Sequence, residues 1–396
     1  MTTPQPPPAV LASAVPAFSL VRGGPMYRVA RALHLISDDF HVCRLALVLV
    51  GVTWIPLIAL SALARATSGH WPPLVADIGV HVRLVLAIPL LLVAEGRMHL
   101  RTERCLDRFV SGRWAHEGDA EVRRIVAVAD RWRDAWWPEL VLVALALAGS
   151  QLVAWGVLEP LGLHRGPHAR QWSGALWWYA LIALPVYQFL LYRWLWRWLL
   201  WAWMLWALSR LNVRPIAIHP DRAGGIDFLA EPSVGFSWVI LASSAVQSGV
   251  WADQIIYRGA SVSSFTSAIA LLIVIAVVIS LGPPCVFSYT MWRARFHAVR
   301  EYGRLATDHS RLFDARWIER GEREQLLGSA DIQAQSDLRN VFETMSRMRI
   351  VPFGARALVI VVLAVVVPMI PLALLELPLL ELVRKLLSIG LGGAPA

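Results

Sequence analysis

The sequence predicts an all-α membrane protein whose chain crosses a bilayer about seven times. Only 16% of its 396 residues are charged, whereas soluble domains carry about 25%. Residues 259–292 contain no Asp, Glu, Lys or Arg, and a helix needs only about 20 apolar residues to cross a bilayer. Most of the 37 Lys and Arg residues gather in alternate loops between such runs, which is typical of multi-pass proteins.

The chain begins with a proline-rich segment. Residues 1–25 contain PQPPPA and no apolar core, so we expect a flexible tail rather than a cleaved signal peptide. The next segment predicts a short helix on the membrane surface, although mitochondrial presequences look similar and an organellar origin stays an alternative. Its apolar residues share one helical face: Val29, Leu33, Ile36 and Phe40.

Seven uncharged or nearly uncharged runs are long enough to cross the membrane. The predicted spans are residues 45–64, 74–95, 140–158, 171–192, 232–257, 265–291 and 357–375. No internal repeat or linker divides residues 26–396, so we treat them as one domain.

The basic residues predict the orientation. Most of them lie before the first span and after the second, fourth and sixth, so the positive-inside rule places the N-terminus in the cytoplasm of a bacterial inner membrane. Seven spans then put the C-terminus in the periplasm. Arg384 and Lys385 fit this topology poorly, unless they belong to an amphipathic helix after Pro378.

Two predicted cytosolic segments, residues 97–136 and 293–352, have helical apolar stripes that need a partner helix, another chain or the membrane surface. The first stripe comprises Val122, Ile125, Val126, Ala129 and Trp132. The second comprises Leu338, Val341, Phe342, Met345 and Met348.

The second span carries the most informative charges. Asp77 and His81 are four residues apart and share a helical face, to which Glu95 returns; Arg83 points elsewhere, about 18 Å from Glu95 along the helix. Ionisable groups at bilayer depth usually line a cavity or meet a partner. One interpretation is a polar pathway or a counter-ion for a ligand. The alternatives are a structural ion pair with a neighbouring span, or a shifted helix that places Arg83 at the outer interface.

Other spans contain polar or helix-breaking residues. Gln151, Gln188 and Gln247 either line a hydrophilic pore or form hydrogen bonds between helices, and the second role is the commoner one. Prolines interrupt the last two spans and are candidate hinges or pore-lining breaks, although proline is ordinary in membrane helices. They are Pro283, Pro284, Pro368 and Pro371.

Residues 193–211, RWLWRWLLWAWMLWALSRL, extend the fourth span to about twice the thickness of the hydrocarbon core. The excess helix must project into the cytosol or turn along the interface. We expect it to anchor the protein there, with Arg193, Arg197 and Arg210 contacting phosphates or stacking on indoles.

Several classes of site are not supported by the sequence. No HExxH, GxSxG or P-loop motif occurs, the three Cys are far apart, and only His81 lies clearly within a span, which argues against a haem site. We therefore expect no metal, no cofactor and no enzymatic activity. Topology explains the net charge of +9 better than nucleic-acid binding does.

Residues 218–228, IHPDRAGGIDF, predict an elbow between membrane helices, because Pro and Gly set turns and Asp caps backbone amides. HPD is also the tripeptide of J-domain co-chaperones, but that domain places it between soluble, charged helices. A role in gating or ligand binding is the alternative for this elbow. Its candidate residues are His219, Asp221, Arg222, Gly224 and Gly225.

HPDRAGG, together with GSADIQAQSDL before the last span and VVPMIPL within it, resembles an uncharacterised family of multi-pass bacterial membrane proteins. That resemblance covers most of the chain and implies no activity. In topology alone, the chain resembles insect odorant and gustatory receptors, which are oligomeric cation channels whose last helix lines the pore. The sequence motifs of those receptors do not occur, so no residue role carries over.

The leading hypothesis is an oligomeric ion channel or pore, with the last span near the conduction path. The first alternative is a secondary transporter that uses the charges of the second span, although the inverted repeats of many transporters are not evident. A membrane scaffold or sensor is the second alternative. The expected partners are the lipid bilayer, further copies of the chain and an unknown ion or small solute.

Overall fold

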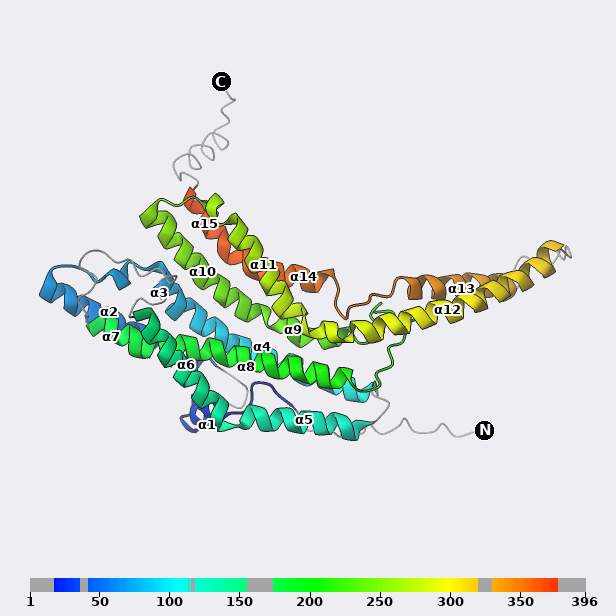
Figure 1. Ribbon diagram of the computed structural model, residues 1–396, viewed down its shortest axis with the longest axis horizontal. Helices are drawn as coiled ribbons and strands as arrows, with labels where there is room; N and C mark the ends of the chain where they lie inside the picture. The colour runs from blue at the N-terminus through cyan, green and yellow to red at the C-terminus, as the bar shows by residue number, and fades with distance from the viewer. Residues whose placement is uncertain are drawn as a thin grey trace, which may run out of the picture.

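Helices form all the regular structure in the part of the chain that the computed structural model describes, residues 18–35, 42–112, 114, 118–154, 174–319 and 330–376. Seven helices there are long and apolar enough to cross a membrane: Cys43–Ser68, Ile78–Ser111, Trp136–Val153, Gly174–Ser209, Asp227–Arg258, Val262–Leu281 and Ala355–Leu375. The predicted fold class is confirmed. The chain is an all-α, multi-pass membrane protein (Figure 1).

Spans two and four each contain a wide π-helical turn, which shifts the faces of the helix relative to an unbroken α-helix. The turn η1 (Pro73–Val75) precedes span two. The span itself comprises α3 (Ile78–His81), η2 (Val82–Ala87) and α4 (Ile88–Ser111). Span four comprises α7 (Gly174–Trp178), η4 (Tyr179–Ala183) and α8 (Leu184–Ser209). Its 36 residues extend about 54 Å at 1.5 Å per residue, beyond a core of about 30 Å. The helical excess predicted for this span therefore projects as a continuation of the span.

Further helices form the remaining membrane spans. They are α2 (Cys43–Ser68), α6 (Trp136–Ala154), α10 (Ser237–Arg258), α11 (Thr266–Leu281), α14 (Ala355–Val366) and α15 (Ile370–Glu376). Short turns join or extend them: η5 (Asp227–Ala230), α9 (Glu231–Gly235), η6 (Val262–Phe265), η7 (Pro283–Phe287) and η10 (Val367–Met369).

The Trp-rich part of α8 lies in the core rather than only at an interface. Trp194 and Trp201 are fully buried. Their indole N–H groups donate to the Leu91 carbonyl at 3.0 Å and to Ser233 Oγ at 2.9 Å. These two indoles have partners inside the protein, whereas Trp206 is 52% exposed and the Arg210 guanidinium carbon lies 5.9 Å from its ring centroid, as the expected stacking requires.

Further helices extend from the end of the bundle at which α4 and α8 terminate. We call it the basic end, because it carries the Arg residues of the predicted cytosolic loops. The helix α5 (Asp119–Asp134) packs along α8 there, with Val122, Val126 and Ala129 of its stripe buried, Ile125 half-buried and Trp132 exposed. A hairpin formed by α12 (Ser288–Phe313), η8 (Asp314–Glu319) and α13 (Ala330–Ser346) projects away from the bundle (Figure 1). Met345 in the α13 stripe is fully buried, so both predicted stripes find partner helices within the chain.

One boundary differs from expectation, and the predicted proline interruptions are present. The predicted sixth span, residues 265–291, ends at Leu281, because Pro283 and Pro284 lack amide hydrogens and divert the chain into η7. In the last span, Pro368 lies in the 3-10 turn η10 and Pro371 follows in α15. The prolines thus interrupt the helices, as predicted.

Part of the expected flexible tail is packed. Phe18, Leu20 and Val21 are buried, and Arg133 Nη1 of α5 donates to the Ser19 carbonyl at 2.6 Å. The surface helix is α1 (Pro25–Ala32), with Val29 exposed. Residues 1–17, 36–41 and 377–396, which include Ile36, Phe40, Pro378, Arg384 and Lys385, lie outside the described residues.

Candidate functional site

The four span-two candidates lie in four different surroundings and do not form one site. The π-helical turn η2 lies between His81 and α4. Each π-turn adds a residue to one helical turn, so a face drawn at 3.6 residues per turn from Asp77 does not continue unchanged to Glu95. The sequence pattern alone could not reveal this shift.

His81 joins spans one and two. Trp54 Nε1 of α2 donates to His81 Nδ1 at 3.0 Å, and His81 Nε2 lies 2.9 Å from the Val75 carbonyl. Because an indole N–H only donates and a carbonyl only accepts, the imidazole is neutral with its hydrogen on Nε2. Both ring nitrogens are satisfied, so this His has a structural role.

Arg83 is buried in the bundle with 2% of its surface exposed. Its Nη1 donates to the hydroxyl group of Tyr179 in η4, and its guanidinium carbon lies 5.7 Å from the Tyr187 ring centroid. No described carboxylate lies within 4.0 Å of this guanidinium. Arg83 is therefore enclosed by the bundle, and its direct neighbours are the Tyr179 hydroxyl group and the Tyr187 ring.

Glu95 belongs to a buried ion network at the basic end. Its Oε1 accepts from Arg193 Nη1 at 2.9 Å and from Arg197 Nη1 at 2.7 Å. Arg193 Nε also lies 3.4 Å from Glu139 Oε1 of α6, whose second oxygen accepts from the Met26 amide at 2.7 Å. Two acids and two bases thus connect α4, α6, α8 and α1. Arg193 and Arg197 contact carboxylates in place of headgroups, and the expected stacking on an indole holds for Arg197, whose guanidinium carbon lies 5.0 Å from the Trp194 ring centroid.

Asp77 lies beside a second buried acid, Asp253 of α10. Asp77 Oδ1 accepts from the Val80 amide at 2.8 Å. The Asp253 carboxylate accepts from the amides of Ile78 and Gly79 at 3.0 and 3.2 Å. The two acids are 4% and 1% exposed, so span two begins against a pair of carboxyl groups.

The glutamines differ in their surroundings. Gln151 Nε2 of α6 donates to the Ala180 carbonyl at 3.4 Å, which joins two spans. Gln188 is buried on α8, and its Oε1 has no hydrogen-bond partner among the described residues. Gln247 is half-buried on α10. These three amides therefore do not converge on one described contact.

The elbow is a compact loop organised by Asp221. Its Oδ1 accepts from the amides of Ala223 and Gly225 at 2.8 and 3.0 Å and lies 2.8 Å from His219 Nδ1. The backbone of Arg222 has a φ of 56°, and the two glycines have φ of 70° and 82°. Arg349, before the last span, donates from its amide to the Arg222 carbonyl at 2.7 Å. The elbow therefore connects span four to the start of span seven.

The Asp221 carboxylate makes the elbow sensitive to acid. Although burial opposes its charged form, the Ala223 and Gly225 amides and the His219 ring hold its pKa below the ordinary value of 3.8. A carboxyl group with a lower pKa in the folded state stabilises the fold above its unfolded pKa, and this contribution is lost as the pH falls through the folded pKa.

We expect Asp221→Asn to lower the unfolding temperature in detergent at pH 6, and the difference from wild type to shrink as the pH falls below about 4. Asp119→Asn, at the first residue of α5, is the comparison variant. A deficit for Asp221→Asn that stays constant from pH 6 to pH 3 would contradict this assignment.

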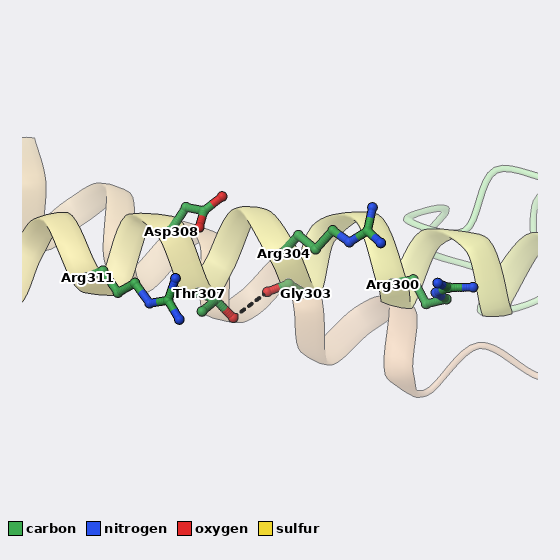
Figure 2. Close-up of a pocket in the computed structure, with 6 residues that line it drawn as sticks. All are labelled: Arg300, Gly303, Arg304, Thr307, Asp308 and Arg311. Carbon is green, nitrogen blue, oxygen red and sulfur yellow. Dashed lines mark hydrogen bonds between the residues drawn. The ribbon is translucent and has the colours of Figure 1, made fainter.

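A surface hollow of about 630 Å³ lies along α12 (Figure 2). All the residues that line it come from this one helix: Arg300, Gly303, Arg304, Thr307, Asp308 and Arg311. The Thr307 hydroxyl donates to the Gly303 carbonyl at 2.8 Å. A hollow on one exposed helix does not enclose a ligand, so we do not regard it as the functional site.

Sequence reasoning missed several residues of the buried sites: Glu139, Tyr179, Tyr187 and Asp253, and the buried roles of Arg193 and Arg197. A depth count offers a signal for part of the network. Glu95 and Arg193 lie 17 and 19 residues into spans that begin at Ile78 and Gly174. At 1.5 Å per residue they therefore lie at similar depths, about 26 and 29 Å.

Comparison with protein-family models, with curated proteins and with solved structures gave no match. Within the described residues, no group of three or more His, Cys, Asp or Glu side chains is arranged to hold a metal ion. The buried charges of the membrane helices are therefore the features that bear on function.

Proposed function

We propose that the protein transports a small anionic solute across the membrane and that Arg83 binds this solute. The observation that carries the proposal is the buried Arg83 guanidinium, which contacts the Tyr179 hydroxyl group and the Tyr187 ring but no described carboxylate. The acid Asp77 acts on this charge at longer range, but a buried guanidinium with no carboxylate in direct contact is costly. An anion that reaches it would add a direct partner through charge-assisted hydrogen bonds.

The tight packing around Arg83 favours a carrier over a permanently open pore. Leu84, Ala87 and Ile88, which follow it along span two, are completely buried. A solute reaches the guanidinium only if the helices move. The π-helical turns η2 and η4 lie at this level in both contacting spans, and such turns are frequent at functional sites. We further propose that the basic end faces the cytoplasm of a bacterial inner membrane.

The test is uptake into liposomes that contain the purified protein, with chloride, inorganic phosphate and succinate as probes. We expect saturable uptake of at least one probe above empty liposomes. Arg83→Gln should reduce it about tenfold or more, because a hydrogen bond to a charged group contributes about 1.5–3 kcal/mol.

Arg108→Gln is the matched control, since Arg108 pairs with Glu231 at the exposed surface. We expect this variant to transport the probe at the wild-type rate. Equal uptake by wild type and Arg83→Gln, or no uptake of any probe by folded protein, would refute the proposal.

An oligomeric channel is the second candidate, favoured by the exposed apolar residues of the projecting hairpin. Leu305, Leu312 and Ile318 are 55%, 72% and 63% exposed, which suits contact with further copies of the chain. Recording in planar bilayers separates the candidates. Discrete unitary currents that change in Pro368→Ala would favour the channel, whereas saturable uptake without such currents would favour the carrier.

A further inference from the structure

The beginning of span two is held unusually close to α10. A Cβ atom on Gly249 would lie 3.1 Å from Gly79 Cα, and one on Gly79 would lie 3.1 Å from Val250 Cγ2. These two glycines therefore allow the backbones to approach. The approach brings Asp253 against the first amides of α3, and the Tyr257 hydroxyl closes the same end by donating to the Ala76 carbonyl at 3.2 Å.

The two acids are unequal in their hydrogen bonding. Both oxygens of Asp253 accept from backbone amides, those of Ile78 and Gly79. Asp77 Oδ1 accepts from the Val80 amide, but Asp77 Oδ2 is buried and has no partner among the described residues. The two carboxyl groups cap the same first turn of α3, because together they accept from three consecutive amides, those of Ile78, Gly79 and Val80. An unsatisfied acceptor thus lies beside a second acceptor, away from water.

The neighbouring groups do not neutralise both acids. Arg83 is the nearby cation and donates to the Tyr179 hydroxyl group rather than to either carboxylate. The neutral His81 ring is directed at Trp54 and Val75, and the Tyr257 hydroxyl at the Ala76 carbonyl. Two ionised carboxylates this close in a buried site repel each other, and one normally takes up a proton.

We propose that Asp77 and Asp253 form a proton-binding site in which Asp77 Oδ2 carries the proton and donates it in a hydrogen bond to the Asp253 carboxylate. The proton satisfies the one acceptor without a partner and leaves a single negative charge near Arg83. The site lies at the end of the bundle opposite the basic end. Proton-coupled transport is a consequence that rests on the proposed transport function, whereas the site itself does not.

The pH dependence of folding tests the site directly. The folded pair holds a proton that the unfolded chain releases, so the stability of the wild type should fall as the pH rises from 5 to 9. In Asp77→Asn, the amide supplies the donor at every pH. Its unfolding temperature in detergent should change less over this range and should exceed that of the wild type at pH 9. Asp107→Asn, at an exposed position of α4, should follow the wild type.

Infrared spectroscopy provides a second readout: the carbonyl band of a protonated carboxyl group should be present at pH 7 in the wild type and missing in Asp77→Asn. Identical pH profiles and identical bands in the two proteins would overturn the proposal. A rise in wild-type unfolding temperature with NaCl but not choline chloride, lost in Asp77→Asn, would overturn it too, since the site would then bind a metal cation.

Liposome uptake separates this inference from the proposed function. If the stability and infrared results hold but no probe enters the liposomes, the proton site stands and the transport function fails. If uptake occurs but responds neither to a pH gradient nor to Asp77→Asn, transport stands and its coupling to this site fails.

Discussion

Replacing Glu95 with Ala should destabilise the protein by about 3–5 kcal/mol, because removal of one partner from a buried ion pair leaves an uncompensated charge. Glu95 accepts from two guanidinium groups at once, and its side chain is 2% exposed. Glu139 remains 3.4 Å from Arg193 Nε in the variant. Arg197 loses its closest carboxylate, and its Nη2 already has no partner among the described residues.

The matched control for Glu95 is Glu103→Ala on the same helix, α4. The Glu103 side chain is 41% exposed, and its Oε2 lies 3.7 Å from His99 Nε2. We therefore expect Glu103→Ala to lower the free energy of unfolding by at most about 1 kcal/mol. Unfolding by heat or denaturant in detergent compares the two variants. Equal stability of Glu95→Ala and Glu103→Ala would show that the buried network does not stabilise the fold.

Replacing Gly225 with Ala should lower the free energy of unfolding by about 2–4 kcal/mol, for two reasons. Its φ of 82° lies in the left-handed region that L-residues avoid. A Cβ atom would also lie 2.2 Å from Cη2 of Trp114. That ring packs between His219 and Phe228, at centroid distances of 6.4 Å from each, so it cannot move without disturbing the elbow.

Gly69→Ala separates the two causes. Gly69 has a φ of 77° and no atom within 4 Å of the added Cβ, so it has the backbone strain without the overlap. We expect Gly69→Ala to lower the free energy of unfolding by about 1 kcal/mol. Thermal unfolding of both variants gives the comparison, and a loss in Gly225→Ala no greater than in Gly69→Ala would mean that Trp114 moves aside freely.

Much of the elbow followed from local sequence. Its proline and glycine positions predicted a turn, and Asp221 was expected to cap backbone amides, as it does for Ala223 and Gly225. These interactions connect residues two and four apart, so the chain near the turn largely specifies them. The contact between Arg349 and the Arg222 carbonyl links residues 127 positions apart, and no local pattern indicates it.

The sequence by itself determined the seven apolar helices, the basic end and the prolines that interrupt the last spans, because apolar length and local backbone chemistry are properties of one segment. Only the tertiary structure decided which charges meet. From the sequence, Arg193 and Arg197 were expected to contact phosphates or stack on indoles. In the structure α4 and α6 place Glu95 and Glu139 beside them, and Arg197 also stacks on Trp194. Asp253 lies beside Asp77 because two glycines, Gly79 and Gly249, let α3 and α10 approach closely. Such pairings depend on the rotation and adjacency of whole helices, and π-helical turns in two of them change that rotation.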